Sequence, residues 1–157
     1  MSVILALPGS EDHATRLGAR LGLHVFAPEV RLFPDGEIYV RIDHELPPDV
    51  ILVGTLDKPA EKFLIVAFLA ATARDLGAKR VGLVAPYLAF MRQDIRFRPG
   101  EGVTSRYFAQ LVSSTVDWLV TVDPHLHRLT SLDGLYTIPT TVARAAPAIA
   151  NWIKSEV

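Results

Sequence analysis

Cysteine is absent from the 157 residues of this sequence. Its absence excludes disulfide bonds, thiolate metal sites and cysteine nucleophiles together, and it fits a reducing compartment, so we expect a cytoplasmic protein. The start also lacks a basic segment followed by a long apolar one. Residues 1–8 therefore suit a first strand better than a signal peptide.

Charge of one sign is not in excess either, because 16 lysine and arginine residues oppose 17 aspartate and glutamate residues, for a formal net charge of −1. This balance excludes the basic surface that binds nucleic acid through its phosphates, so any phosphate recognition must be local. The most apolar later run, 63–73, is shorter than the about 20 residues that span a bilayer. We expect neither a nucleic-acid partner nor a membrane span.

What is present is a large hydrophobic fraction, 50% of the residues. A chain of this length and composition matches one domain, 1–157, with a single core and with strands buried on both faces. Apolar runs bounded by proline and glycine predict strands at 3–7, 50–53, 81–84 and 118–122.

Helical patterns separate these runs. Ser10 stands where an N-cap is expected for a first helix that ends near Gly22. Further helices are predicted at 59–76, from Thr104 onward, and at 142–154 with Pro147 as a candidate kink. Alternating strands and helices predict an α/β fold with a mainly parallel sheet, and 30–33 with 38–42 predicts an antiparallel hairpin.

Polar side chains gather in two loops that follow strands, where open α/β sheets bind ligands. The first loop, 85–103, carries forked donors and an amide suited to phosphate, base or ribose: Arg92, Gln93, Arg96 and Arg98. On composition alone the same loop could be a solvated surface segment with ion pairs to Asp94 and Glu101.

The second loop places Asp123 and His125 two positions apart, so that both can face one divalent metal or one phosphate. A surface histidine is the plain alternative. A third segment, 33–37, reads Phe-Pro-Asp-Gly-Glu and by itself could be a strand connection whose carboxylates face water.

Together these segments resemble the N-terminal domain of the ribose-phosphate diphosphokinase, or phosphoribosyl pyrophosphate synthetase, family. The resemblance rests on 31–41, on Pro86-Tyr87 followed by Arg92-Gln93-Asp94, and on 122–125, in the same order and spacing over nearly the whole chain. It implies a phosphoribosyltransferase-like three-layer domain with helices on both faces of a mainly parallel sheet.

The resemblance also implies a reaction, the transfer of diphosphate from Mg-ATP to the 1-hydroxyl of ribose 5-phosphate, and a homo-oligomer between dimer and hexamer. It implies that Phe33, Asp35 and Glu37 help to bind the adenine of a neighbouring subunit's site, and it counts Gly36 among the ATP-binding residues. It assigns ATP to Arg92 and Gln93, and the Mg²⁺ side of the nucleotide to His125 and Asp123.

Two departures from the family pattern stand out. The family's second domain, with its ribose 5-phosphate loop, and its catalytic lysine-arginine loop have no counterpart in the sequence, so the catalytic residues are unknown and we expect this chain alone to be inactive. After His125 the family continues with alanine and later places aspartates around an Ile-Pro pair. Here His127 and Arg128 follow instead, and Thr137 and Thr141 flank that pair.

Other functions remain open on the sequence. One is a catalytically inactive associated or regulatory subunit of the same family, which sequence beyond Val157 would separate from the enzyme. Another is a phosphoribosyltransferase-related domain, although the paired acidic residues before a Thr-Gly turn that it requires are missing. A third is a plain interaction domain, in which Arg92→Ala would leave behaviour unchanged.

Overall fold

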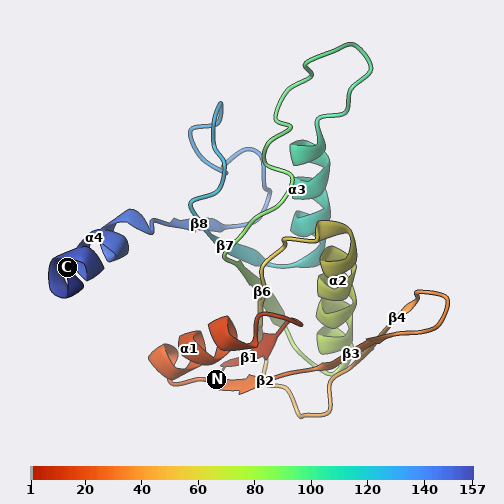
Figure 1. Ribbon diagram of the computed structural model, residues 1–157. Coiled ribbons are helices and arrows are strands. Elements are labelled where there is room, and N and C mark those ends of the chain that lie inside the picture. Colours follow the sequence, from red (N-terminus) through yellow and green to blue (C-terminus); the bar gives the residue numbers. More distant parts are fainter. Residues whose placement is uncertain (1) are drawn as a thin grey trace.

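The computed structural model describes residues 2–157 and contains a six-stranded, fully parallel sheet (Figure 1). The strand order is β2-β1-β5-β6-β7-β8. The strands are β1 (Ser2–Ala6), β2 (His24–Phe26), β5 (Asp49–Val53), β6 (Arg80–Ala85), β7 (Trp118–Val122) and β8 (Thr140–Ala143). The predicted α/β class with a mainly parallel sheet is confirmed.

Helices cover both faces of this sheet, as Figure 1 shows. On β1, Val3 and Leu5 pack into the larger core beside α2 and α3, whereas Ile4 and Ala6 pack beside α1. This alternation is the two-residue period of a strand buried on both faces. The helices are α1 (Glu11–Leu21), α2 (Pro59–Asp75), α3 (Thr104–Thr115) and α4 (Ala146–Glu156).

The predicted hairpin forms a separate two-stranded sheet of β3 (Glu29–Leu32) and β4 (Ile38–Arg41). It packs on α2 through β4 and projects from the body of the domain (Figure 1). Its turn is closed by the Phe33 N–H, which donates to the Glu37 carbonyl at 2.8 Å. Gly36 adopts a φ of 90°, which a side chain would disfavour.

The prediction of a helix from residue 142 is wrong at its start. Val142 and Ala143 lie in β8, where two threonines and a valine suit a strand. The helix α4 begins at Ala146, and Pro147 sits in its first turn, where proline fits without a kink. None of the residues of α4 is buried, and Figure 1 shows the helix extending away from the sheet beyond β8.

Ser10 stands at the N-cap of α1, but the expected capping hydrogen bond is not formed. Its hydroxyl oxygen instead accepts a hydrogen bond from the Thr55 N–H at 3.1 Å, so it joins the loops that follow β1 and β5. The end of α1 is as predicted, with Gly22 in the left-handed conformation at a φ of 66°.

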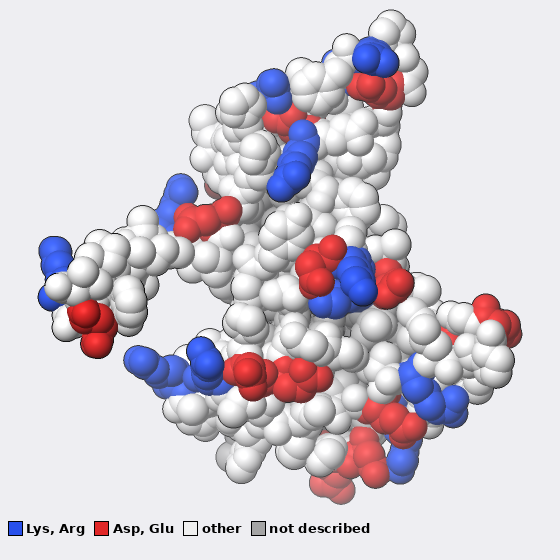
Figure 2. All heavy atoms as spheres, viewed as in Figure 1, with Lys and Arg blue, Asp and Glu red and all other residues white. Residues whose placement is uncertain are grey.

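Within residues 2–157, no helix has both the length and the apolar character needed to cross a membrane. On the face drawn in Figure 2, acidic and basic side chains are interspersed without an extended patch of one sign. This distribution agrees with the balanced charge of the sequence.

Candidate functional site: a cavity at the carboxyl ends of β6 and β7

A cavity of about 400 Å³ opens at the carboxyl ends of the adjacent parallel strands β6 and β7. It is lined by both predicted loops, so Arg92 and Gln93 face the same space as Asp123 and His125. The topology explains the meeting, because the loops after neighbouring parallel strands emerge at one edge of the sheet.

Strained backbone marks the same cavity. Phe90, with a φ of 59°, and Asp123, with a φ of 38°, are the two non-glycine residues of positive φ between residues 2 and 157. Each costs conformational energy that the surrounding structure must offset. Both residues line the cavity, one from each loop. Such outliers concentrate at binding and catalytic sites.

Gln93 is held by the start of α3. Its side-chain oxygen accepts a hydrogen bond from the Thr104 hydroxyl at 3.0 Å, and its main-chain oxygen accepts one from the Ser105 N–H at 3.3 Å. The amide nitrogen of Gln93 is left as a donor at the cavity wall. Arg92 is exposed and makes no ion pair or side-chain hydrogen bond within the described residues, so its charge is free for an anion.

On the other wall, Asp123 is partly engaged by the segment after β8. Its Oδ2 accepts a hydrogen bond from the Ala145 N–H at 2.9 Å, and its Oδ1 lies 3.7 Å from the Arg144 guanidinium. His125 is exposed, and its ring lies nearly parallel to that of His127 at a centroid distance of 5.9 Å.

No group of three or more His, Asp or Glu side chains that could hold a metal occurs between residues 2 and 157. A bare metal site is therefore not built by these residues. Mg²⁺, however, usually binds through one or two carboxylates together with substrate phosphates and water. The Asp123 carboxylate fits that shared kind of coordination, and His125 faces the same cavity as Arg92, whose guanidinium suits phosphate oxygens.

The remainder of the first loop is ordered by Glu101. Its Oε2 accepts hydrogen bonds from the N–H groups of Phe97 at 2.8 Å and Arg98 at 3.0 Å, and its carbonyl accepts one from the Arg96 side chain at 3.0 Å. Arg96 and Arg98 lie outside the residues that line the cavity. The sequence analysis did not predict two contacts of these loops, the hydrogen bond from Thr104 to Gln93 and the ion pair between Asp94 and Arg128.

The hairpin residues are not brought to this cavity. Phe33, Asp35, Gly36 and Glu37 are exposed at the hairpin tip, and the last three line a shallow pocket against Leu64 and Phe68 of α2. Figure 1 shows the hairpin at the lower right, apart from the loops after β6 and β7, which lie at the top.

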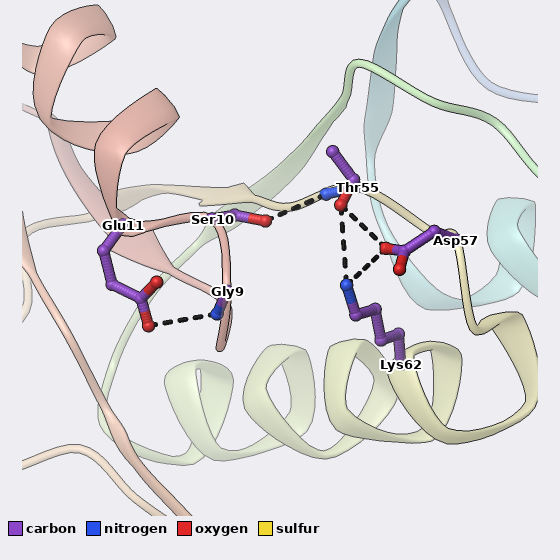
Figure 3. Close-up of polar contacts among 6 residues, drawn as sticks. All are labelled: Gly9, Ser10, Glu11, Thr55, Asp57 and Lys62. Carbon is purple, nitrogen blue, oxygen red and sulfur yellow. Dashed lines mark hydrogen bonds and ion pairs between the residues drawn. The ribbon is translucent and has the colours of Figure 1, made fainter.

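A second polar cluster, which the sequence did not reveal, lies at the carboxyl ends of β1 and β5 (Figure 3). Lys62 forms an ion pair with Asp57, and the Thr55 hydroxyl donates to the same carboxylate at 2.9 Å. The hydrogen bond from Lys62, followed by that from Thr55, lowers the pKa of Asp57 from 3.8 to about 2.

Comparison with known proteins agrees with this geometry. The sequence profile described as the N-terminal domain of ribose phosphate pyrophosphokinase matches residues 2–115. The chain belongs to the ribose-phosphate pyrophosphokinase family. The ribose-phosphate pyrophosphokinase of Methanobrevibacter smithii is 34% identical over 157 residues, which cover 99% of this chain and 52% of that protein. That of Saccharolobus solfataricus is 45% identical over 100 residues, or 62% of this chain and 34% of that protein.

The fold of the chain also matches that of a solved structure. The crystal structure of phosphoribosylpyrophosphate synthetase from Mycobacterium smegmatis superposes with a TM-score of 0.84 at 23% identity, covering 99% of this chain and 52% of that chain. The chain thus spans about half the length of the Methanobrevibacter and Mycobacterium proteins. The resemblance to the family and the three-layer α/β fold with a mainly parallel sheet are confirmed.

Proposed function

We propose that this chain binds Mg-ATP in the cavity after β6 and β7 and supplies the ATP side of a ribose-phosphate pyrophosphokinase. In the complete reaction diphosphate passes from ATP to the 1-hydroxyl of ribose 5-phosphate. One observation carries the proposal: Arg92, a cation without a partner among residues 2–157, faces the same cavity as His125.

Each cavity residue has a task that its chemistry suits. Arg92 neutralises triphosphate oxygens through its forked donors, and the free amide nitrogen of Gln93 donates to the nucleotide. Asp123 and His125 hold the magnesium side of the nucleotide. The bound Mg²⁺ supplies charge neutralisation on the phosphates, while the protein contributes position and further positive charge.

The hairpin serves a different copy of the chain in this proposal. Phe33, Asp35, Gly36 and Glu37 would contact the adenine bound by a neighbouring subunit of a homo-oligomer. Their exposure and their separation from the cavity support this assignment. The Phe33 ring is held in place by the Arg31 guanidinium, which lies 4.7 Å from its centroid and 4.1 Å from that of Tyr39.

We assign the ribose side of the reaction to residues outside 1–157. Relatives such as the Methanobrevibacter enzyme are about twice as long as the aligned region, which leaves room for a second domain. We therefore expect no phosphoribosyl pyrophosphate from the chain mixed with Mg-ATP and ribose 5-phosphate. Formation of that product in a coupled assay would contradict this part of the proposal.

The proposal is tested by titrating Mg-ATP into the purified chain and measuring heat. Saturable binding is expected, with severe weakening in Arg92→Ala and His125→Ala. Arg106→Ala is the matched control, because Arg106 is also exposed and makes no side-chain ion pair within residues 2–157 but lies outside the cavity. Absence of binding to the unaltered chain, or equal binding by Arg92→Ala, would refute the proposed ATP site.

A further inference from the structure

The loops on the two sides of the cavity are joined by an ion pair between Asp94 and Arg128. Arg128 Nη1 donates to Asp94 Oδ1 at 3.0 Å across 34 positions of sequence. The Asp94 side chain is 3% exposed and that of Arg128 is 41% exposed. A cation from the loop after β7 thus reaches a carboxylate buried in the loop after β6.

A second contact connects the same arginine to the same loop. The Arg128 guanidinium lies 5.4 Å from the centre of the Phe97 ring, within the range of a cation–π interaction. Leu126 and Leu129 on either side are half-buried against the main core. The segment that carries Arg128 is thus packed on the core, while its guanidinium reaches Asp94 and Phe97.

The pair is not the arrangement that stability alone would favour. The second carboxylate oxygen of Asp94, Oδ2, is buried and has no hydrogen-bond partner among residues 2–157. A buried carboxylate with one unsatisfied oxygen loses much of what its ion pair contributes. What the pair does provide is a fixed link between the two loops.

That geometry concerns the two residues to which the proposed function assigns ATP. Asp94 follows Arg92 and Gln93 directly in the chain, and Arg128 stands three positions after His125. Arg92 and His125 line one cavity from opposite loops, and the Asp94–Arg128 pair joins those two loops. A shift of about 1 Å between groups that hold one ligand can cost a large factor in function.

We propose that Asp94 and Arg128 are positioning residues, which hold the two cavity loops in the one arrangement that lets Arg92 and His125 engage the same triphosphate. The inference rests on the proposed function for its ligand. Its claim about the loops can be measured without any ligand.

The first measurement is amide hydrogen exchange on the chain without nucleotide, for Asp94→Asn and Arg128→Gln. The reporters are the N–H groups of Phe97 and Arg98, which donate to Glu101, and that of Ser105 in α3, which donates to the Gln93 carbonyl of the first loop. Their exchange is expected to rise about tenfold in both variants as the loop opens locally. Unchanged exchange at these amides would overturn the inference.

The matched control is Arg74→Gln. Arg74 pairs with Asp117 at the same distance, 3.0 Å, but at the amino ends of the strands, away from the cavity. Its substitution is expected to leave the exchange of the first loop and the affinity for Mg-ATP unchanged. A rise in loop exchange equal to that in Arg128→Gln would mean general destabilisation and would overturn the inference.

The second measurement uses Mg-ATP as the probe. Arg128→Gln is expected to weaken binding about five- to tenfold, Arg128→Lys less, and the double variant with Asp94→Asn no more than either alone. The effect of Arg128→Gln should vanish in an Arg92→Ala background, because the pair acts through Arg92. Looser loops with unaltered affinity would overturn the positioning role. Failure of the unaltered chain to bind Mg-ATP would count against the proposed function, while hydrogen exchange would still decide whether the pair holds the loops.

Discussion

The edge of the sheet at the strand carboxyl ends carries two polar clusters of opposite character. Around β1 and β5, Lys62 is neutralised by Asp57, so that the cluster satisfies its own charges (Figure 3). Around β6 and β7, Arg92 has no partner within the described residues, and a cavity of about 400 Å³ lies in front of it.

The difference shows how to separate structural charges from those reserved for a ligand. A cation with an internal carboxylate at hydrogen-bond distance has little net charge to offer an anion, whereas an unpaired one beside a cavity has all of it. By this reasoning we expect the closed cluster, Lys62 with Asp57, to support the fold and the open one, around Arg92, to bind an anion. Removing the unpaired cation of one cluster and the paired cation of the other tests this distinction.

The largest effect is expected from Arg92→Ala. Removing the free cation should weaken Mg-ATP binding by about 2 kcal/mol, or roughly thirtyfold, since charge-assisted hydrogen bonds are among the strong ones. The melting temperature should be unchanged because Arg92 contributes no ion pair to the fold within residues 2–157. Calorimetric titration measures the affinity and thermal melting the stability. A large fall in melting temperature would show that Arg92 supports the fold.

A smaller effect is expected from His125→Ala. If His125 lies on the magnesium side of the nucleotide, its loss should raise the magnesium concentration needed for half-maximal ATP binding by roughly tenfold. His127→Ala is the control, because its ring stacks beside that of His125 but lies outside the cavity lining. Equal magnesium dependence in both variants would contradict the assignment of His125.

Lys62→Met is expected to do the reverse of Arg92→Ala and to lower stability without changing affinity. It removes the partner of Asp57 from a half-buried position, so thermal stability should fall modestly while Mg-ATP affinity stays the same. The same two measurements apply. A loss of affinity without a loss of stability would show that the closed cluster also takes part in binding.

The smallest expected effect is on the stability of the fold at acidic pH. Because the pKa of Asp57 is about 2 in the folded chain and 3.8 ordinarily, its ion pair stabilises the fold above pH 3.8 and loses that contribution as the pH falls toward 2. Asp57→Asn should therefore flatten the acid side of the stability curve in this window. Urea unfolding at a series of pH values would measure it, and an identical pH dependence in both proteins would contradict the lowered pKa.

Much of the fold and of the cavity could be predicted from local pattern. Runs such as 50–53 and 81–84 are apolar enough to predict strands buried on both faces, and the rule that ligands bind after parallel strands selected Arg92 and His125. The ATP, magnesium and compartment assignments stay predictions. The short strands β2 and β8 were not predicted, because three or four residues carry too little periodicity.

The contacts that shape the cavity could not be predicted in the same way. Asp94 meets Arg128, and Thr104 meets Gln93, only once the chain has folded, and no spacing in the sequence encodes either meeting. Ser10 shows the converse case. Local pattern placed it correctly at a helix start, yet tertiary structure gave its hydroxyl a partner 45 positions away, at Thr55.

The separation of the hairpin from the cavity has a genetic consequence. If each working site combines the hairpin of one copy with the cavity of another, Phe33→Ala and Arg92→Ala damage opposite halves of that site. Two such defective chains, co-expressed at equal levels in a cyclic assembly, would restore about one quarter of the sites by random pairing. Two alleles that each fail alone would then complement one another.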